Sequence, residues 1–393
     1  MTHYFIEAYS SPGERVLDIF SGTGTSPLQA CIDGRVGIGN DVSPEAYLLT
    51  RAKVDPPSSN HFFDYLIELH RRLVSKQREK FEKGDLYFGD NFLKIKLSLP
   101  VYYHRETLSQ LVRLRSLILS DMKSTSMPRS RNARFCAALV LGILHGDRPE
   151  SLSMPLDRSK SLTANHIRTM QKKYPGKYER RYKDVIQCLA LKAEKVYRNA
   201  PPRTKGLAYN KDAAEFMLDS VDMVITSPPY YSAHTYPYDN RHRLWFLGHD
   251  YRRIQRKMFQ TSNTFEYSHY ILRCLRNIQT MLKDGGACVL VVGDVEMDSK
   301  GEKIMKKTGE IIADQWADSR NTEMEVARII VDHIPLKSRR YIHVPVSKGI
   351  KLERIVVFHK GRMSDRNVLT NWSNRPRSED QPNWPEFREQ RIL

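Results

Sequence analysis

The most informative short segment of the chain is Thr-Ser-Pro-Pro-Tyr at residues 226–230, which directly follows the apolar run 221–225. Two consecutive prolines fix φ and cannot extend a sheet, so they predict a stiff turn at the carboxyl end of a strand. There the Ser227 hydroxyl and the Pro228 carbonyl could hold both hydrogens of an aromatic amino group and direct its lone pair towards an electrophile. Tyr230 could stack on a base swung out of a duplex. The alternative is a Pro-Pro turn with no chemical role.

A glycine-rich turn, Asp-Ile-Phe-Ser-Gly-Thr-Gly-Thr, occupies residues 18–25 after another short apolar run. Its glycines allow the backbone to pass close to a ligand at the carboxyl end of a strand. A nicotinamide dinucleotide needs a further glycine three residues after Gly24, where this chain has Pro27, so the turn suits a ligand without phosphate. S-adenosylmethionine is such a ligand: its ammonium suits Asp18, and its ribose hydroxyls suit Asp41 after the next strand. The alternative is a tight structural corner.

The elements that must position these two turns have the pattern of a doubly wound α/β sheet. Near the N-terminus we expect a strand at 16–19, a helix capped by Ser26 with Pro27 at its first position, and a strand at 36–39. The pattern resumes far along the chain with a helix at about 266–282 and with strands at 221–225, 287–292, 328–331 and 355–358.

Between these two stretches, residues 60–200 have the apolar spacing of long, charged helices, and Pro201-Pro202 closes the block. A polar, Ser- and Arg-rich stretch at 121–134 predicts a loop within it. The whole chain has a net charge of +18, and residues 61–210 alone contain 30 Lys and Arg against 14 Asp and Glu. A polyanion is the natural partner of such a block, although a solvated helical surface is the alternative.

The two turns and Asp41 together resemble the amino-methylating DNA methyltransferases, the cytosine-N4 and adenine-N6 enzymes. The resemblance implies a catalytic site formed by Ser227, Pro228, Pro229 and Tyr230. It also implies an S-adenosylmethionine site formed by Asp18, Phe20, Gly22, Gly24, Thr25, Asp41 and Asp212, the last as the acid that contacts the adenine of the cofactor. Family members carry a further cofactor-binding element before the first strand, for which the chain offers residues 4–9.

Ser227, where other members have Asp or Asn, favours cytosine-N4 over adenine-N6 as the methylated position. Cytosine-C5 chemistry needs a cysteine nucleophile, usually after a proline, and the sequence contains no Pro-Cys pair. Two other readings stay open. One is an RNA amino-methyltransferase, for example one acting on guanine in tRNA. The other is a DNA-binding protein on a methyltransferase fold without activity.

The expected fold is α/β, a Rossmann-like S-adenosylmethionine-dependent methyltransferase sheet interrupted by a mostly helical basic insertion. We expect the first part of the methyltransferase domain at 1–59, the insertion, with target recognition, at 60–206, the second part at 207–360 and a tail at 361–393. The expected partner is double-stranded DNA, with a companion restriction endonuclease.

Several classes of protein are not expected. The sequence has no apolar run of eighteen residues and no secretory signal, and its five cysteines are scattered, so we expect a cytoplasmic, nucleoid-associated protein without disulfides. His234, His242 and His249 lack the spacing of metal ligands, so we expect no metal site. The nearby Tyr236, Tyr238 and Trp245, with Tyr231, Arg241 and Arg243, predict either the wall of a base pocket or the packed start of a helix.

Overall fold

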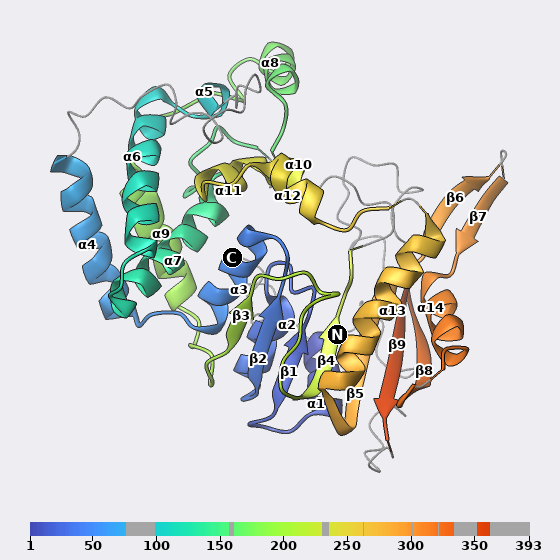
Figure 1. The fold of residues 1–393 in the computed structure, drawn as a ribbon. Coiled ribbons are helices and arrows are strands. Elements are labelled where there is room, and N and C mark those ends of the chain that lie inside the picture. The colour runs from blue at the N-terminus through green and yellow to red at the C-terminus, as the bar shows by residue number, and fades with distance from the viewer. Residues whose placement is uncertain are drawn as a thin grey trace, which may run out of the picture. The chain divides into compact units, whose positions relative to one another are not determined.

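The computed structural model describes residues 1–75, 99–156, 161–229, 236–261, 263–299, 302–320, 322–333 and 352–361 (Figure 1). These residues fall into two compact units. The sheet unit comprises the described residues of 1–42, 202–234 and 259–388, and the helical unit comprises those of 43–201 and 235–258. Tyr230, Tyr231, His234 and residues 362–393 of the expected tail lie outside the described residues.

Seven strands form one sheet in the order β3-β2-β1-β4-β5-β9-β8. Their bounds are β1 Arg15–Asp18, β2 Val36–Asn40, β3 Leu207–Tyr209, β4 Val221–Thr226, β5 Leu282–Gly293, β8 Met324–His333 and β9 Leu352–Lys360. The strands from β3 to β5 are parallel, whereas β9 runs antiparallel to both of its neighbours. The remaining two strands, β6 Val295–Ser299 and β7 Glu302–Lys306, form a separate hairpin. The expected Rossmann-like α/β fold is therefore confirmed, as are the six expected strands.

Both faces of the sheet are buried, which explains why its central strands are almost continuously apolar. Successive residues of a strand point to opposite faces. In β4, Met223 and Ile225 therefore pack with helix α1 (Thr2–Tyr9) and helix α2 (Thr25–Ile32). Val224 packs on the other face with α13 (Thr264–Met281) and α14 (Thr308–Ala317). The sheet thus lies between two layers of helices (Figure 1).

The start of α2 differs from the sequence prediction. Gly24 occupies the N-cap with φ of +79°, so the helix begins at Thr25 and neither Ser26 nor Pro27 has its expected position. No side chain caps this helix. Glycine adopts such a left-handed conformation at little cost, which lets the helix begin two residues earlier than expected.

The helical unit is built from ten helices among its described residues, α3 Pro44–Val54, α4 Ser59–Ser75, α5 Leu99–Tyr102, α6 Arg105–Met122, α7 Met127–Ile143, α8 Ala164–Lys173, α9 Val185–Tyr197, α10 Tyr236–Asp239, α11 Arg241–Phe246 and α12 Tyr251–Lys257. Its boundaries differ from the expected insertion at 60–206. Leu48 and Leu49 of α3 and Trp245 of α11 are buried in its core with the apolar side of α7. Segments on both sides of the expected insertion therefore complete this unit.

The prediction of a loop at 121–134 is wrong for most of this stretch, because α7 begins at Met127. Arginines in its first turns have carboxylate partners from distant segments. Arg131 Nη2 donates to Asp55, and Arg129 donates to Asp121 at 3.2 Å and to Glu68 at 2.7 Å. Because these partners neutralise its charges, a stretch that is polar in sequence packs as a helix.

None of the helices in the described ranges is long and apolar enough to cross a membrane.

A candidate ligand site at the carboxyl ends of the central strands

The topology of the sheet unit creates a switch point between β1 and β4. From β1 the chain continues to β2 and β3 on one side, and it then returns to β4 and β5 on the other side. In open α/β sheets, ligands bind outside the carboxyl ends of the strands at this point, because loops that leave in opposite directions leave a crevice between them. The glycine turn follows β1 and the Ser-Pro-Pro segment follows β4, so both sequence motifs flank the switch point.

Direct hydrogen bonds join these two motifs. Thr226, the last residue of β4, donates its hydroxyl to Asp18 Oδ1 at 2.7 Å, and its Oγ1 accepts the backbone N–H of Phe20 at 3.2 Å. Phe20 N–H also donates to Asp18 Oδ1 at 3.1 Å. Residues about 200 positions apart in the sequence are therefore held together, and Ser227 is the next residue after this contact.

The carboxyl group of Asp18 is buried, which disfavours its ionised form. Only 5% of its surface is exposed, and burial raises the pKa of its carboxyl group to about 6. Hydrogen bonds from Thr226, Ser26 and Phe20 oppose this rise in pKa, whereas the charge of Asp41 adds to it. A positively charged ligand nearby would favour the ionised form of this carboxyl group.

The glycine turn is fixed to the end of β2. Gly22, with φ of +51°, donates its backbone N–H to Asp41 Oδ2 at 2.9 Å. Ser21 N–H donates to the carbonyl of Asn40 at 2.9 Å, and Gly24 N–H donates to the carbonyl of Ser21 at 2.7 Å. Asp41 is therefore at the expected place beside the turn and also closes it. Thr25 is exposed as the first residue of α2.

A third acid, Asp212, follows β3. Its Oδ1 accepts the hydroxyl of Tyr270 at 2.9 Å and the backbone N–H of Ala214 at 2.9 Å. The ring of Tyr270 stacks on Phe259 with 4.0 Å between centroids and lies 6.3 Å from the ring of Phe20. Acidic side chains thus lie at or just after the carboxyl ends of three neighbouring strands, β1, β2 and β3. Aromatic rings adjoin Asp212, the acid after β3.

The described part of the Ser-Pro-Pro segment forms the other side of the switch point. Ser227 is exposed, Pro228 is buried and Pro229 is half-buried. Tyr267 of α13 donates its hydroxyl to the carbonyl of Pro229 at 3.1 Å, which fixes the Ser-Pro-Pro segment to this helix. Ser227 is therefore presented to solvent by two residues that are themselves held in place.

Asn40 is a positioning residue that the sequence did not reveal. It is fully buried at the end of β2, and its Nδ2 donates to the carbonyls of Ile19 at 3.2 Å and Lys211 at 3.1 Å. Its Oδ1 accepts the backbone N–H of Lys211 at 3.1 Å. One amide therefore ties together the segments that follow β1, β2 and β3. The only signal in the sequence was a polar residue at the end of an apolar strand.

Residues 4–9, where a further cofactor-binding element was expected, belong to helix α1. Its Phe5 and Ile6 are fully buried against the sheet, among Val16 of β1 and Ile225 of β4. The middle of α1 therefore contributes to the core of the sheet unit.

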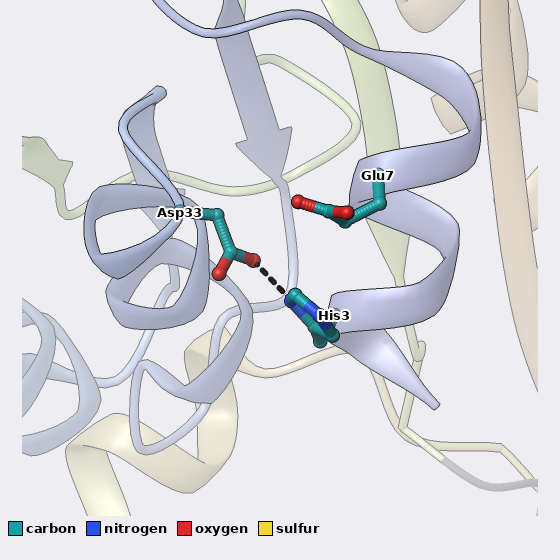
Figure 2. Close-up of side chains that lie close together, drawn as sticks. All are labelled: His3, Glu7 and Asp33. Carbon is teal, nitrogen blue, oxygen red and sulfur yellow. Dashed lines mark hydrogen bonds and ion pairs between the residues drawn. The ribbon is translucent and has the colours of Figure 1, made fainter.

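A cluster of His3, Glu7 and Asp33 offers ligand atoms within 4.8 Å of one another (Figure 2). Asp33 lies just before the amino-terminal end of β2, whereas the glycine turn lies at the carboxyl ends of the strands. His3 Nδ1 lies 2.9 Å from Asp33 Oδ2, and the buried Arg35 donates to Glu7 at 3.4 Å. Because Arg35 already supplies a positive charge there, the cluster is better suited to hold α1 against the end of α2 than to bind a cation.

The aromatic and histidine run at 236–249 belongs to the helical unit. Trp245 is fully buried, and Arg241 is buried with its guanidinium donating to the carbonyls of Ser161 and Leu162. The ring of His242 bonds to that of His145 at 2.8 Å between nitrogens. Trp245, Arg241 and His242 are therefore packed, which agrees with the second of the two expectations for this run, whereas Tyr236 and Tyr238 are exposed.

Neither a scan against protein-family models nor a search of curated proteins finds a match to the chain. Solved structures with a similar arrangement include TrmN from Thermus thermophilus, with 10% identity and a TM-score of 0.32 over 91% of this chain and 48% of that one. They also include a SAM-dependent methyltransferase from Methanosarcina mazei, with 10% identity and a TM-score of 0.32 over 92% and 98% of the two chains. A third is the rRNA methyltransferase AviRa from Streptomyces viridochromogenes, with 9% identity and a TM-score of 0.28 over 93% and 84%. The chain spans about half the length of TrmN. TM-scores of this size do not carry the fold assignment, which rests on the strand order.

Proposed function

We propose that this chain is an S-adenosylmethionine-dependent methyltransferase that methylates the exocyclic amino group of a DNA base. The observation that carries the proposal is the bond between Thr226 and Asp18, with 2.7 Å between Oγ1 and Oδ1. This bond joins the end of β1, where the glycine turn begins, to the end of β4, where the Ser-Pro-Pro segment begins. A cofactor site and an amine-binding site are therefore adjacent, as methyl transfer requires.

The residues at the carboxyl ends of β1, β2 and β3 fit this cofactor. Asp18 offers a buried carboxylate for a cationic group, and Asp41 offers a carboxylate beside the glycine turn for the ribose hydroxyls. Asp212 and the neighbouring rings of Phe20 and Tyr270 offer a polar group and flat apolar surfaces for the adenine. The turn lacks the third glycine of a pyrophosphate site, in keeping with a ligand that carries no phosphate. When bound, the cofactor supplies an electrophilic methyl group.

On the other side of the switch point, the chain's own residues activate the amine. An amino group on an aromatic ring is a poor nucleophile because its lone pair is delocalised into the ring. The Ser227 hydroxyl and the Pro228 carbonyl accept hydrogen bonds from the two N–H groups of this amine. These bonds localise the lone pair on the nitrogen and direct it towards the methyl group. Tyr267 holds the carbonyl of Pro229, so these acceptors are positioned before the amine arrives. Tyr230 stacks on the base in this proposal.

The nucleic acid and its base are the least constrained parts of the proposal. The basic block at 61–210 supports a polyanionic substrate, and the helical unit contains most of it. Ser227 favours cytosine-N4 over adenine-N6. Double-stranded DNA is the proposed substrate, and the target base is drawn out of the helix to reach the site.

The test is to incubate the chain with methyl-labelled S-adenosylmethionine and either genomic DNA or total RNA, and then to analyse the digested nucleosides. We expect labelled 4-methylcytosine from DNA. Ser227→Ala should lower this product at least about 100-fold, because a lost acceptor in a preorganised site costs about that much. The matched control is Ser319→Ala, which should keep full activity. Ser319 lies two residues after α14 and donates its hydroxyl to the carbonyl of Gln315. Label in RNA alone, or in neither nucleic acid, would contradict the proposal.

A further inference from the structure

One segment of the helical unit combines positive charge with exposure. Residues 163–184, which comprise α8 and the turn after it, contain seven Lys and Arg and two acidic residues, a net charge of +5. Ile167 is the only residue of α8 that is buried, and Met170 packs half-buried against the core of the unit. Most other side chains of the segment therefore face solvent, and we call its exposed face the α8 surface.

Aromatic rings contact two of the lysines on the α8 surface, Lys173 and Lys177. Lys173 Nζ lies 5.3 Å from the ring centroid of Tyr174, and Lys177 Nζ lies 5.8 Å from Tyr174 and 5.5 Å from Tyr178. The two rings meet edge to face at 6.2 Å, and 45% of Tyr174 is exposed. Cation–π contacts restrict these long side chains, so less conformational entropy is lost when an anion binds to them.

The same surface is hollowed. A depression of about 500 Å³ is lined by Gln171, Tyr174, Gly176, Tyr178, Glu179, Arg180 and Arg181. Its rim is fixed, because Gln171 Nε2 donates to the carbonyl of Tyr178 at 3.2 Å and Arg180 Nη1 donates to the carbonyl of Pro100 at 2.6 Å. A volume of this size accommodates a small ligand or one nucleotide. The lining offers cations for a phosphate and aromatic rings for a base.

We propose that the α8 surface is where the helical unit binds the phosphodiester backbone of the nucleic-acid substrate. The proposal rests on the proposed function for the identity of that substrate. Charge alone would also suit an anionic membrane. A membrane-binding helix, however, exposes an apolar face, whereas the exposed residues of α8 are polar, such as Asn165, Arg168 and Lys172. The fixed lysines and the depression between aromatic rings favour nucleic acid.

The test compares the double variant Lys173→Gln/Lys177→Gln with the control Arg71→Gln/Lys123→Gln, which removes two exposed charges from α4 and from the end of α6. Binding of a labelled DNA duplex, the matching single strand and the matching RNA is followed by fluorescence anisotropy between about 50 and 200 mM salt. The first variant should bind about tenfold more weakly, and the slope of log affinity against log salt should fall by about 2, one for each lost phosphate contact. The control variant should change neither quantity, and both variants should keep the affinity for S-adenosylmethionine.

Wild-type affinity and slope in Lys173→Gln/Lys177→Gln would overturn the proposal. So would binding to vesicles of anionic lipid that the variant loses, if no nucleic acid binds to the wild-type chain. Failure of the proposed function has a different signature: the variant weakens nucleic-acid binding as expected, but the wild-type chain forms no methylated nucleoside. Tyr174→Ala gives an independent check, because removing the ring that holds both lysines should also weaken binding, about threefold or more.

Discussion

The buried carboxyl group of Asp18 makes cofactor binding dependent on pH. Burial raises its pKa from the ordinary value of 3.8 to about 6. The folded chain therefore keeps this proton longer than the unfolded chain, so the group's contribution to stability is complete below pH 3.8 and is lost as the pH rises through 6. Ionising Asp18 therefore costs about 3 kcal/mol more in the folded chain than in the unfolded chain. A bound cation offsets this cost, so Asp18 loses its proton when the cation binds.

If only the ionised form binds S-adenosylmethionine, a pKa of about 6 makes the affinity about tenfold weaker at pH 5 than at pH 7. Binding at pH 5 should also release about 0.9 proton, against almost none at pH 8. Calorimetry in two buffers of different ionisation enthalpy measures both quantities. Asp18→Asn keeps an oxygen that accepts from Thr226 and Phe20 but cannot ionise, so it should bind the cofactor weakly and with a flat pH profile. Equal affinity at both pH values, with no proton release by the wild-type chain, would refute this reasoning.

Three further substitutions test the surroundings of the site. Asp41→Asn keeps an acceptor for Gly22 N–H but loses the charge, so calorimetry should show about tenfold weaker cofactor binding, and unchanged affinity would remove Asp41 from the site. Asn40→Ala leaves the backbone groups of Ile19 and Lys211 without their amide partner, which should lower the free energy of unfolding by about 2 kcal/mol or more. The melting temperature of the sheet unit should then fall by about 4–8 °C. An unchanged melting curve would contradict the positioning role of Asn40. Tyr267→Phe removes the hydroxyl that holds the carbonyl of Pro229, so kcat should fall several-fold while cofactor affinity is kept, and an equal loss of both would indicate a general structural defect.

The sequence predicts the sheet well because its central strands are buried on both faces and are almost continuously apolar. β2, β4, β5, β8 and β9 include the runs expected to be strands, and β1 includes all but the last residue of its expected run. β3 is only three residues long and half-exposed, so its pattern was too weak to predict a strand. The N-cap of α2 was placed wrongly because a left-handed Gly24 took the role expected of Ser26.

The helical unit was harder to delimit from sequence. Its core combines α3 and α11, which lie on either side of the expected insertion, and such long-range packing leaves no local pattern. The arginines of α7 misled for a similar reason. Asp55 and Glu68, which neutralise them, lie more than 60 positions earlier in the chain.

The candidate site was predicted in its parts and not in its connections. Residue types and spacing pointed to Asp18, Asp41 and Ser227, and the family resemblance pointed to Asp212. The structure places all four at or just after the carboxyl ends of strands that end at one edge of the sheet. The hydrogen bonds that organise the site come from Thr226, Asn40 and Tyr267. Asn40 and Tyr267 belong to no recognisable motif, and Thr226 belongs to the Thr-Ser-Pro-Pro-Tyr segment without an expected role of its own. The contacts of all three could not be predicted, because only the fold brings their partners near.

The central claim is that the cofactor and the amine-binding segment meet at the switch point between β1 and β4. The most direct measurement is a crystal structure of the chain with S-adenosylhomocysteine bound. The account predicts the ligand at the carboxyl ends of β1 and β2, against the turn that contains Gly22, with its ribose on Asp41 and its sulfur facing Ser227. A ligand bound elsewhere on the chain, or no binding at saturating concentration, would contradict it.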